Sequence, residues 1–220
     1  MKNKCIILLS GGLDSVVALA LAKQRYRVAF ALTFDYGQRT FRPELGAARA
    51  VCRYFGVKHY ALDISWLGRI SRSALTQGKP VGLEHLVSVD DVWVPNRNGV
   101  FLSIAAALAE SAGIKHIVTG FNREEARQFP DNSRAFVKAF NRSLDFSTRG
   151  KVLVISLVGG LDKSEIVRVG IKHKIPFELI YSCYLGRKRM CGKCASCRRL
   201  KDALGNVGAR KYLELLFKER

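Results

Sequence analysis

Six residues close to the N-terminus have the types and the spacing of an anion-binding turn. An apolar run over 5–9 has the pattern of a buried parallel strand, and an apolar helix pattern starts at about Ser15. Such a strand–turn–helix unit directs backbone N–H groups and the positive end of the helix at one place, where phosphate binds. The residues of the turn are Ser10, Gly11, Gly12, Leu13, Asp14 and Ser15.

The composition of this turn favours a phosphate site over a plain connection. Adjacent glycines let the backbone approach a ligand without an intervening Cβ, and Ser10 and Ser15 add hydroxyl donors. The turn lacks the G-x-x-x-x-G-K-[ST] pattern, so it is not a Walker loop. We predict that it holds phosphate, and we prefer this to the interpretation that Gly11 and Gly12 only turn a strand into a helix.

A group of cysteines near the C-terminus has metal-ligand spacing. Two overlapping C-x-x-C pairs follow a fourth cysteine eight residues upstream, and the four are Cys183, Cys191, Cys194 and Cys197. Four thiolates suit a structural zinc ion, and an iron–sulfur cluster is the chemical alternative. Zinc is preferred because the short spacing suits a small structural site. Cys5 and Cys52 lie on apolar patterns and are expected in the core.

Length and composition describe a globular protein with a strong positive charge. The chain has 220 residues, 48% hydrophobic and 25% charged, with a formal net charge of +19. It has no apolar run long enough to span a membrane and begins directly with a strand pattern, so we expect a cytoplasmic protein. The charge favours acidic partners; a nucleic acid is possible but not required. The densest basic residues are Arg187, Lys188, Arg189, Lys193, Arg198, Arg199 and Lys201.

Strand and helix patterns alternate along the chain. We expect strands over 5–9, 27–33, 58–64, 116–119 and 152–157, and helices from about 15 and over 43–55, 98–113, 133–146, 162–173 and 209–218. Asp162 and Glu165 have the spacing of a capping box. The stretch 71–91 has no clean period and is expected to be an irregular connection.

This alternation predicts an α/β fold, a Rossmann-like parallel sheet with helices on both faces. Ligands of such sheets bind beyond the carboxyl ends of the strands. Ser10–Ser15, 35–39 and 119–122 would emerge at that edge and form one site. We expect a nucleotide-binding domain over 1–180, followed by a metal-binding segment and a C-terminal helix over 181–220.

Several segments occur together in the order of one family. They are S-G-G-L-D-S, F-D-Y-G-Q-R, V-P-N-R-N, F-P-D-N-S, L-D-K-S-E-I-V and S-C-Y-L-G…C-G-K-C-A-S-C-R-R-L. Nearly the whole chain resembles the 7-cyano-7-deazaguanine synthase (QueC) family of the ATP pyrophosphatase (PP-loop) superfamily. The first loop alone indicates only the superfamily, whereas the combination with V-P-N-R-N and the cysteine tail is far more specific.

The resemblance implies an ATP-dependent ligase of queuosine and archaeosine biosynthesis. Its substrates would be 7-carboxy-7-deazaguanine and ammonia, its cofactors ATP, Mg²⁺ and Zn²⁺, and its assembly a homodimer. The carboxylate would attack the α-phosphate of ATP to give an acyl adenylate and pyrophosphate. Ammonia would displace AMP to give an amide, and a second adenylation would permit dehydration to the nitrile.

Roles for individual residues follow from this resemblance and from their chemistry. Asp14, Arg97 and Lys163 are the predicted catalytic residues. Asp14 would cap its helix or approach Mg²⁺, and Lys163 would meet phosphate, because a cation is unfavourable in the first turn of a helix. The loop 10–15 would hold ATP. Arg39 would neutralise phosphate or substrate carboxylate, unless it is a surface arginine.

The substrate is predicted to contact Arg97, Asn98 and Asp131. The alternatives are that Asn98 is a plain N-cap and that Asp131 caps the following helix. Phe34 and Tyr36 could flank a base, although aromatic residues at strand ends are more often core residues.

One segment departs from the pattern of the family. Pro130-Asp131 is present, but the residues of 120–129 differ from the usual bacterial form, and Asn122, Glu124 and Glu125 are expected to make contacts that the common form makes otherwise. The alternative function is an ATP-dependent tRNA-modifying sulfurtransferase of the same superfamily. A non-catalytic zinc-ribbon protein is a third possibility, against which the phosphate loop argues.

Overall fold

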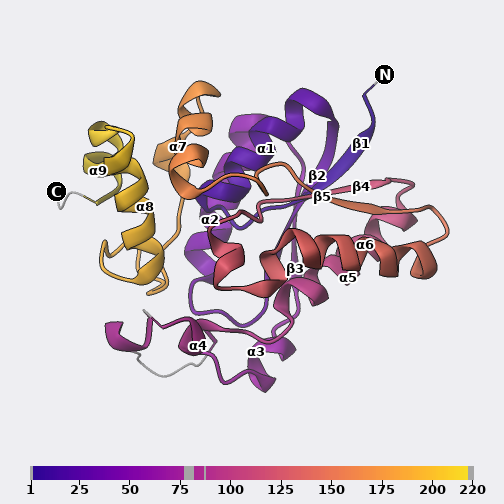
Figure 1. Cartoon of the computed structure of the whole chain (residues 1–220), viewed down its shortest axis with the longest axis horizontal. Helices are drawn as coiled ribbons and strands as arrows, with labels where there is room; N and C mark the ends of the chain where they lie inside the picture. The colour runs from indigo at the N-terminus through magenta and orange to yellow at the C-terminus, as the bar shows by residue number, and fades with distance from the viewer. Residues whose placement is uncertain (1, 77–81, 87, 218–220) are drawn as a thin grey trace.

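A computed structural model describes residues 2–76, 82–86 and 88–217 of the chain. In this part of the chain, parallel strands form a five-stranded sheet with the order β3-β2-β1-β4-β5 (Figure 1). The strands are β1 (Lys4–Leu8), β2 (Arg27–Asp35), β3 (His59–Asp63), β4 (His116–Thr119) and β5 (Leu153–Ser156). The predicted fold is therefore confirmed, and each strand lies within two residues of its expected bounds.

Helices cover both faces of this sheet, as the alternating pattern predicts. The longer helices are α1 (Leu13–Arg25), α2 (Phe41–Phe55), α5 (Arg97–Ser111), α6 (Arg134–Ser147), α7 (Lys163–Lys172), α8 (Ala195–Asn206) and α9 (Arg210–Phe217). The short elements are α3 (Trp66–Ile70), α4 (Val89–Val92) and the 3₁₀ turns η1 (Leu83–Leu86), η2 (Glu125–Arg127), η3 (Pro130–Asn132) and η4 (Phe177–Leu179). Part of the irregular stretch 71–91 lies outside the described residues.

The two faces of β1 belong to two different apolar clusters. Cys5 and Ile7 pack in a cluster with the buried faces of α1, α2 and α7, whereas Ile6 packs in a cluster with α5. Alternate residues of a strand point to opposite faces, and a strand covered on both faces must therefore be apolar throughout. This explains the continuous apolar run over 5–9. Cys52 is also buried in the first cluster, as expected.

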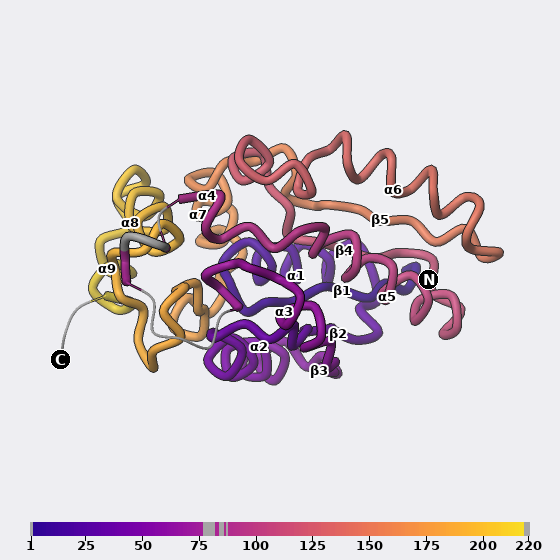
Figure 2. Tube along the Cα trace, turned by 90° about the horizontal axis from the view of Figure 1, so that it is seen from below, coloured from indigo at the N-terminus to yellow at the C-terminus, as the bar shows by residue number. Residues whose placement is uncertain are grey.

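The cysteine segment packs directly on the sheet domain. The cluster that contains α1 and α7 continues without a break into Cys183, Cys194 and Leu200. Both views place α8 and α9 at the end of the molecule away from the N-terminus (Figures 1 and 2). Helix α8 was not predicted, because ligand-type cysteines and basic residues hide its apolar face of Leu200, Ala203 and Leu204.

Helix ends follow local side-chain chemistry in several places. Asp162 and Glu165 form the predicted capping box at the start of α7. Gly56 ends α2 in the left-handed conformation, with φ of 63°. Within the described ranges, the helices are too short or too polar to cross a membrane.

Candidate functional site

The predicted phosphate loop is a tight turn held by its own serines. Ser15 Oγ donates a hydrogen bond to Gly12 O at 3.0 Å, and the Ser10 and Ser15 hydroxyls lie 3.2 Å apart. Gly11 has φ of +80°, and a Cβ there would lie 2.8 Å from Ala47 Cβ. Only glycine adopts this conformation at this close approach to α2 without strain. The loop therefore leads β1 into α1 with little backbone freedom.

A cavity of about 240 Å³ opens at the carboxyl ends of β1, β2 and β4. Its wall includes Ser10, Gly12, Asp14 and Ser15 of the loop, together with Arg97, Asn98 and Lys163. The predicted convergence of distant segments at one edge of the sheet is therefore present. Gly120, directly after β4, leaves no room for a side chain, since its Cβ would lie 2.7 Å from Ser15 N.

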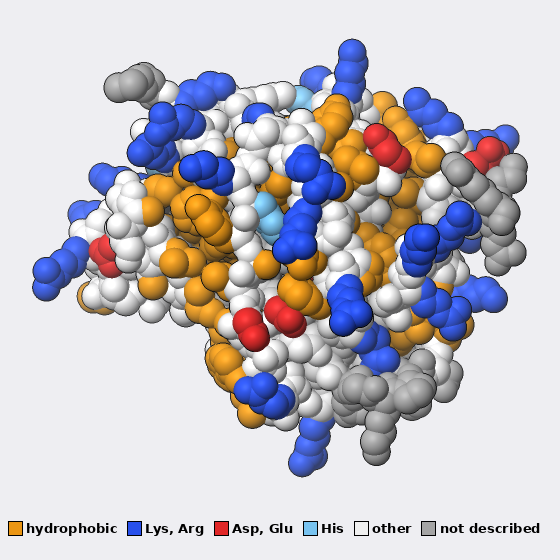
Figure 3. All heavy atoms as spheres, turned by 180° about the vertical axis from the view of Figure 1, so that it is seen from behind, with side chains coloured by type: hydrophobic (Ala, Val, Ile, Leu, Met, Phe, Trp, Pro, Cys, Tyr) orange, Lys and Arg blue, Asp and Glu red, His pale blue; other side chains and the backbone are white. Residues whose placement is uncertain are grey.

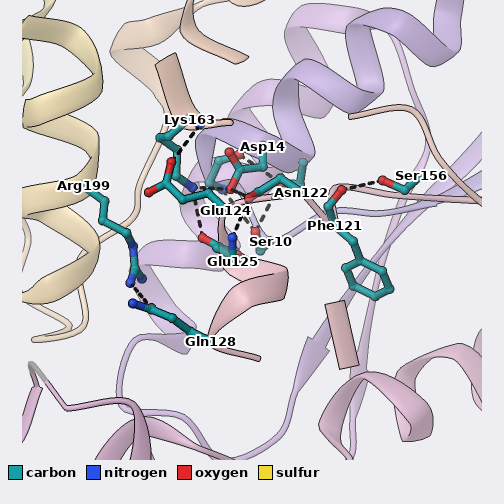
Figure 4. A network of polar contacts seen from close by, with 12 residues as sticks. Ser10, Asp14, Phe121, Asn122, Glu124, Glu125, Gln128, Ser156, Lys163 and Arg199 are labelled. Carbon is teal, nitrogen blue, oxygen red and sulfur yellow. Dashed lines mark hydrogen bonds and ion pairs between the residues drawn. The ribbon is translucent and has the colours of Figure 1, made fainter. Parts of the chain in front are cut away.

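An ion-pair cluster lies on one side of the cavity. Lys163 Nζ lies 2.5 Å from Asp14 Oδ2 and 3.0 Å from Glu125 Oε1, and the lysine side chain is 9% exposed. Asn122 Nδ2 donates to Asp14 Oδ2 at 3.2 Å, so α1, α7 and the segment after β4 meet here (Figure 4). Two carboxylates face one ammonium group, which leaves the cluster one net negative charge.

Burial and mutual attraction compete in setting the pKa values of this cluster. Burial raises the pKa of Asp14 to about 6, although Lys163 partly opposes the shift. Burial also disfavours the charge of Lys163, but Asp14 and Glu125 outweigh it and raise the lysine pKa. Burial likewise disfavours the charge of Glu125, but Lys163 and Arg199 outweigh it and lower that pKa. Lys163 therefore stays charged in the folded protein.

The cluster corrects the expectation that Asp14 caps its helix, and it shows which side chains compensate the charge of Lys163; phosphate at Lys163 stays a prediction. Gly12, not Asp14, is the N-cap of α1, and Asp14 lies in the first turn with its carboxylate on Lys163. The cation of Lys163 is compensated by Asp14 and Glu125, so the helix position alone does not require phosphate. Glu124 Oε2 also accepts a hydrogen bond from the Lys163 backbone N–H at 3.0 Å. Glu125 and Asn122 of the variant segment thus contact the predicted catalytic residues.

Arg97 lies in the cavity wall at the start of α5. Its Nη1 donates to Tyr36 Oη at 3.2 Å, and its guanidinium carbon lies 5.4 Å from the centre of the Tyr36 ring. Arg97 Nε is buried without a hydrogen-bond partner among the described residues. A half-buried, always charged fork donor with an unused, buried N–H suits an anionic ligand such as a carboxylate.

Asn98 and Asp131 bind each other. Asn98 N–H donates to Asp131 Oδ2 at 3.2 Å, and Asn98 Nδ2 donates to Asp131 O at 3.3 Å. Neither residue has the capping role considered from the sequence, since Asn96 is the N-cap of α5 and Ser133 that of α6. Asp131 instead places its carboxylate at the N-terminus of α5, where negative charge is favourable. Its Oδ1 has no partner among the described residues.

Arg39 does not reach the cavity wall in this structure. Its Nε donates to Ala74 O at 2.9 Å, and its neighbours Gln38 and Thr40 line the cavity instead. The predicted role of Arg39 at phosphate stays a prediction. Phe34 lines the cavity and stacks on Phe101, with ring centres 4.4 Å apart, so it is both a core residue and part of the cavity wall.

Sequence reasoning missed a half-buried carboxylate in the first turn of α2. Glu44 accepts hydrogen bonds from Thr40 Oγ1 at 2.6 Å and from Gln38 Nε2 at 3.1 Å, and all three residues line the cavity. Burial raises the pKa of Glu44, and the two hydrogen bonds oppose that shift. Glu44 lies beyond the quoted F-D-Y-G-Q-R segment, which ends at Arg39, so no motif of the sequence singled it out.

The four predicted cysteines form a cluster beside the cavity. Their Sγ atoms all lie within 4.8 Å of one another, and three of the four residues are buried. Backbone N–H groups donate to this sulfur cluster, for example Cys194 N to Cys191 Sγ at 3.2 Å and Cys191 N to Cys183 Sγ at 3.3 Å. Such bonds stabilise thiolates, and four converging thiols fit one metal ion. The expected convergence of the four cysteines is therefore present, in an arrangement that could hold a metal ion.

Comparisons with known proteins agree with this geometry. The family model "Queuosine biosynthesis protein QueC" matches residues 4–208. The chain is 46% identical over 212 residues to the 7-cyano-7-deazaguanine synthase of Carboxydothermus hydrogenoformans. The alignment covers 92% of this chain and 99% of the relative. The chain is 42% identical over 224 residues to that of Methanosarcina barkeri, covering 96% and 97%.

Solved structures with a similar fold include two RNA-modifying enzymes. A 4-thiouridine synthetase in complex with RNA and bound ATP has a TM-score of 0.54 at 22% identity, covering 96% of this chain and 52% of that chain. The U34-tRNA thiolase NcsA from Methanococcus maripaludis has a TM-score of 0.53 at 14% identity, covering 98% and 71%. At such identities the likeness shows the fold alone. The family-model match and the relatives above 40% identity, by contrast, cover almost the whole chain, and the chain belongs to the QueC family.

Proposed function

We propose that the chain is a 7-cyano-7-deazaguanine synthase, which converts 7-carboxy-7-deazaguanine and ammonia to the nitrile at the expense of ATP. The relatives that carry this name match nearly the whole chain at 42–46% identity. The observation that supports the proposal most directly is the cavity, because the glycine loop, Arg97 and the Asp14–Lys163 pair all line it. The product serves queuosine or archaeosine biosynthesis.

The reaction needs a site that brings two anions together. The substrate carboxylate attacks the α-phosphate of ATP, forming a carboxylic–phosphoric anhydride and releasing pyrophosphate. Ammonia attacks the carbonyl and AMP leaves, which gives the amide. The amide oxygen attacks the α-phosphate of a second ATP and releases a second pyrophosphate and a proton, and loss of AMP and the remaining N–H proton gives the nitrile. Adenylation makes the leaving group good, so the protein acts mainly by positioning and by charge stabilisation.

Each part of the cavity suits one of these tasks. We assign the pyrophosphate to the loop Ser10–Ser15 and the substrate carboxylate to Arg97, whose Nε is buried without a partner among the described residues. Lys163 holds Asp14 in place and offsets negative charge near the phosphates. Asn98 and Asp131 fix the start of α5, and Asn98 lines the cavity that receives the substrate. Asp131 remains a candidate for contacting the substrate, and Arg39 one for contacting phosphate.

Two metal ions belong to this proposal. Asp14 Oδ1 is buried and without a partner in the part of the chain that the structure describes, and a carboxylate oxygen of this kind suits Mg²⁺. Mg²⁺ supplies positive charge to the polyphosphate. Zinc is the ion that we assign to the four cysteines, because it prefers four thiolates in structural sites. It crosslinks the segment 181–220, which we treat as the metal-binding part beside the nucleotide-binding domain 1–180.

The remaining expectations concern assembly and partners. We propose a cytoplasmic homodimer that acts on small molecules. The sulfurtransferase alternative has only the shared fold in its favour. Lys and Arg side chains are scattered over the face drawn in Figure 3 and do not gather in one patch there, so this face gives no specific support for RNA binding.

Mass spectrometry of the product tests the proposed function. The purified protein is incubated with ATP, Mg²⁺, ammonium and 7-carboxy-7-deazaguanine, and the expected product is the nitrile, with two AMP formed for each. Accumulation of the amide alone would limit the activity to the first half of the reaction. No conversion of the substrate under these conditions would reject the function.

A further inference from the structure

The segment that carries the cysteines also forms part of the cavity wall. Ser182 and Tyr184 line the cavity on either side of Cys183, and Ser196 lines it between Cys194 and Cys197. The residues next to the cysteines therefore face the cavity, while the cysteines themselves form the metal-type cluster. A crosslink at the cysteines would hold all three in place.

Direct hydrogen bonds join this segment to the rest of the site. Tyr181 N–H donates to Gly11 O of the phosphate loop at 2.9 Å. Gly186 approaches the backbone of Arg39 so closely that a Cβ would lie 2.5 Å from Arg39 O. On the other side, Arg199 Nη1 of α8 donates to Gln128 Oε1 at 2.9 Å (Figure 4). The cysteine segment thus contacts three segments, at Gly11, Arg39 and Gln128, whose neighbouring residues line the cavity.

The hydroxyl of Tyr184 is oriented by Arg199. Arg199 Nη2 donates to Tyr184 Oη at 3.1 Å, so the tyrosine oxygen accepts this bond. Tyr184 Oη makes no other hydrogen bond within the described ranges. A hydroxyl that accepts from an arginine keeps its own proton available as a donor. Because Tyr184 lines the cavity together with Arg97 and Lys163, an acceptor for this proton belongs to a ligand.

We propose that Tyr184 contacts the reactants directly. Its hydroxyl donates a hydrogen bond to an anionic oxygen, either of the ATP phosphates or of the substrate carboxylate. Arg199 is the positioning residue that orients this hydroxyl, and the metal-bound cysteine segment anchors both. Cys194 ties the pair together, since it caps α8 and its Sγ accepts from Tyr184 N–H at 3.5 Å. The proposal rests on the proposed synthase function for the identity of the carboxylate, but not for that of ATP.

Binding measurements on two matched pairs of variants test this role. Tyr184→Phe removes only the hydroxyl and is compared with Tyr212→Phe, whose ring stacks on Phe177 outside the cavity wall. Arg199→Met is compared with Arg198→Met, the exposed neighbour on α8. Calorimetry measures the Kd of Mg·ATP and of 7-carboxy-7-deazaguanine separately, and zinc content and melting temperature are measured for every variant.

Tyr184→Phe is expected to weaken binding of one of the two anions by on the order of tenfold, as for a hydrogen bond to a charged acceptor, with zinc content unchanged. The ligand whose Kd changes, Mg·ATP or 7-carboxy-7-deazaguanine, is the one that carries the oxygen bound by Tyr184. Arg199→Met is expected to weaken binding of the same ligand, and Arg199→Lys to restore part of this loss. The double variant Tyr184→Phe/Arg199→Met binds that ligand no more weakly than Tyr184→Phe alone. Unchanged affinity for both anions in Tyr184→Phe would overturn the proposal.

Removal of the metal provides an independent readout. Chelator-treated protein is expected to lose affinity for the same anion as Tyr184→Phe, and added Zn²⁺ restores it. Full affinity in protein that is folded and free of metal would reject the anchoring role of the cysteines. The Kd of Mg·ATP is measured without turnover, so it tests the role of Tyr184 even in a protein that forms no nitrile. Failure of the synthase function is therefore distinguishable from failure of the role of Tyr184.

Discussion

Lys163 Nζ and Asp14 Oδ2 lie 2.5 Å apart, and this contact joins the first turns of α7 and α1 across 149 residues of sequence. The side chains are 9% and 15% exposed, so both charges have left water. Such a pair holds its geometry only while each charge is compensated, because an unpaired buried charge is costly. The pair therefore links the stability of the protein to the placement of its predicted catalytic residues.

Replacement of Lys163 by methionine is expected to destabilise the protein by about 3–5 kcal/mol, because Asp14 and Glu125 lose their shared cation while they remain buried. Urea unfolding measures this change. Adding Glu125→Gln to the variant removes one of the unpaired charges and recovers part of the loss. Lys172→Met, at the exposed end of α7, is the control and changes stability little. A Lys163→Met protein as stable as wild type would contradict the assigned charge balance.

Asp14→Asn tests the catalytic part of the cluster. Asparagine keeps the shape of the side chain but removes the charge that we assign to Mg²⁺, and misplacement at a reacting centre costs on the order of 100-fold in rate. Pyrophosphate release is expected to fall by at least this factor, while the unfolding transition stays cooperative. Release at the wild-type rate would remove Asp14 from the reacting groups.

The two loop glycines are expected to respond differently to alanine. Gly11→Ala strains a residue with φ of +80° and brings Cβ within 2.8 Å of Ala47, which destabilises the fold by about 1–3 kcal/mol. Gly12 has φ of −78°, and its Cβ would meet the hydroxyls of Ser182 at 3.3 Å and Ser10 at 3.4 Å, with Tyr181 O at 3.6 Å. Gly12→Ala therefore keeps most of the stability and weakens ATP binding.

Thermal unfolding and nucleotide titration of both variants separate these effects. An equal loss of stability in the two variants would mean that both glycines serve only the turn, which is the plain interpretation of the sequence pattern. A loss of ATP affinity confined to Gly12→Ala supports the proposal that the loop Ser10–Ser15 binds the phosphates of ATP.

The strands and the phosphate loop could be predicted because their signals are local. The apolar run over 5–9 reflects burial on both faces of β1, and glycines next to serines mark a turn at a helix start. The cysteine spacing likewise specified the metal site, since the four sulfur atoms come from one short segment. In each case the evidence lies within a few residues of the chain.

The partners of charged residues could not be predicted because they depend on tertiary structure. The helix-dipole argument predicted an anionic partner for Lys163 but could not identify Asp14 and Glu125, which are distant in sequence and supply its counter-charges. Asn98 and Asp131 each had a local capping interpretation, and only the fold shows that they bind each other. Glu44 and Tyr184 were missed for the same reason, since their burial against the cavity leaves no local pattern.

Cys194→Ser is expected to lose zinc and stability together. Cys194 is fully buried, is the N-cap of α8 and contributes one of the four sulfur atoms, so its loss opens the cage and loosens the segment that packs on α7. Metal binding is coupled to folding in sites of this kind. Zinc analysis and the melting temperature measure the two losses, and Cys52→Ser, in the core away from the cage, lowers stability without loss of zinc. A Cys194→Ser protein with full zinc content would reject the cage.

Glu44 gives the unfolding free energy a specific pH dependence. Because burial raises its pKa, the folded protein binds this proton more tightly than the unfolded chain does. The contribution of Glu44 to stability is therefore fully present below the pKa of the unfolded chain, about 4.3, and is lost as pH rises through the folded value. Glu44→Gln lacks this titration, so its stability relative to wild type is expected to rise across the same window.

Urea unfolding of both proteins between about pH 4 and pH 8 measures this difference. The gain of the variant amounts to about 1.4 kcal/mol for each pH unit that separates the folded and unfolded pKa values. The change with pH is the informative quantity, because the offset also contains the cost of placing an amide between Thr40 and Gln38. A difference that stays constant with pH would mean that these two hydrogen bonds fully offset the burial of Glu44, and a difference that falls would mean that they exceed it.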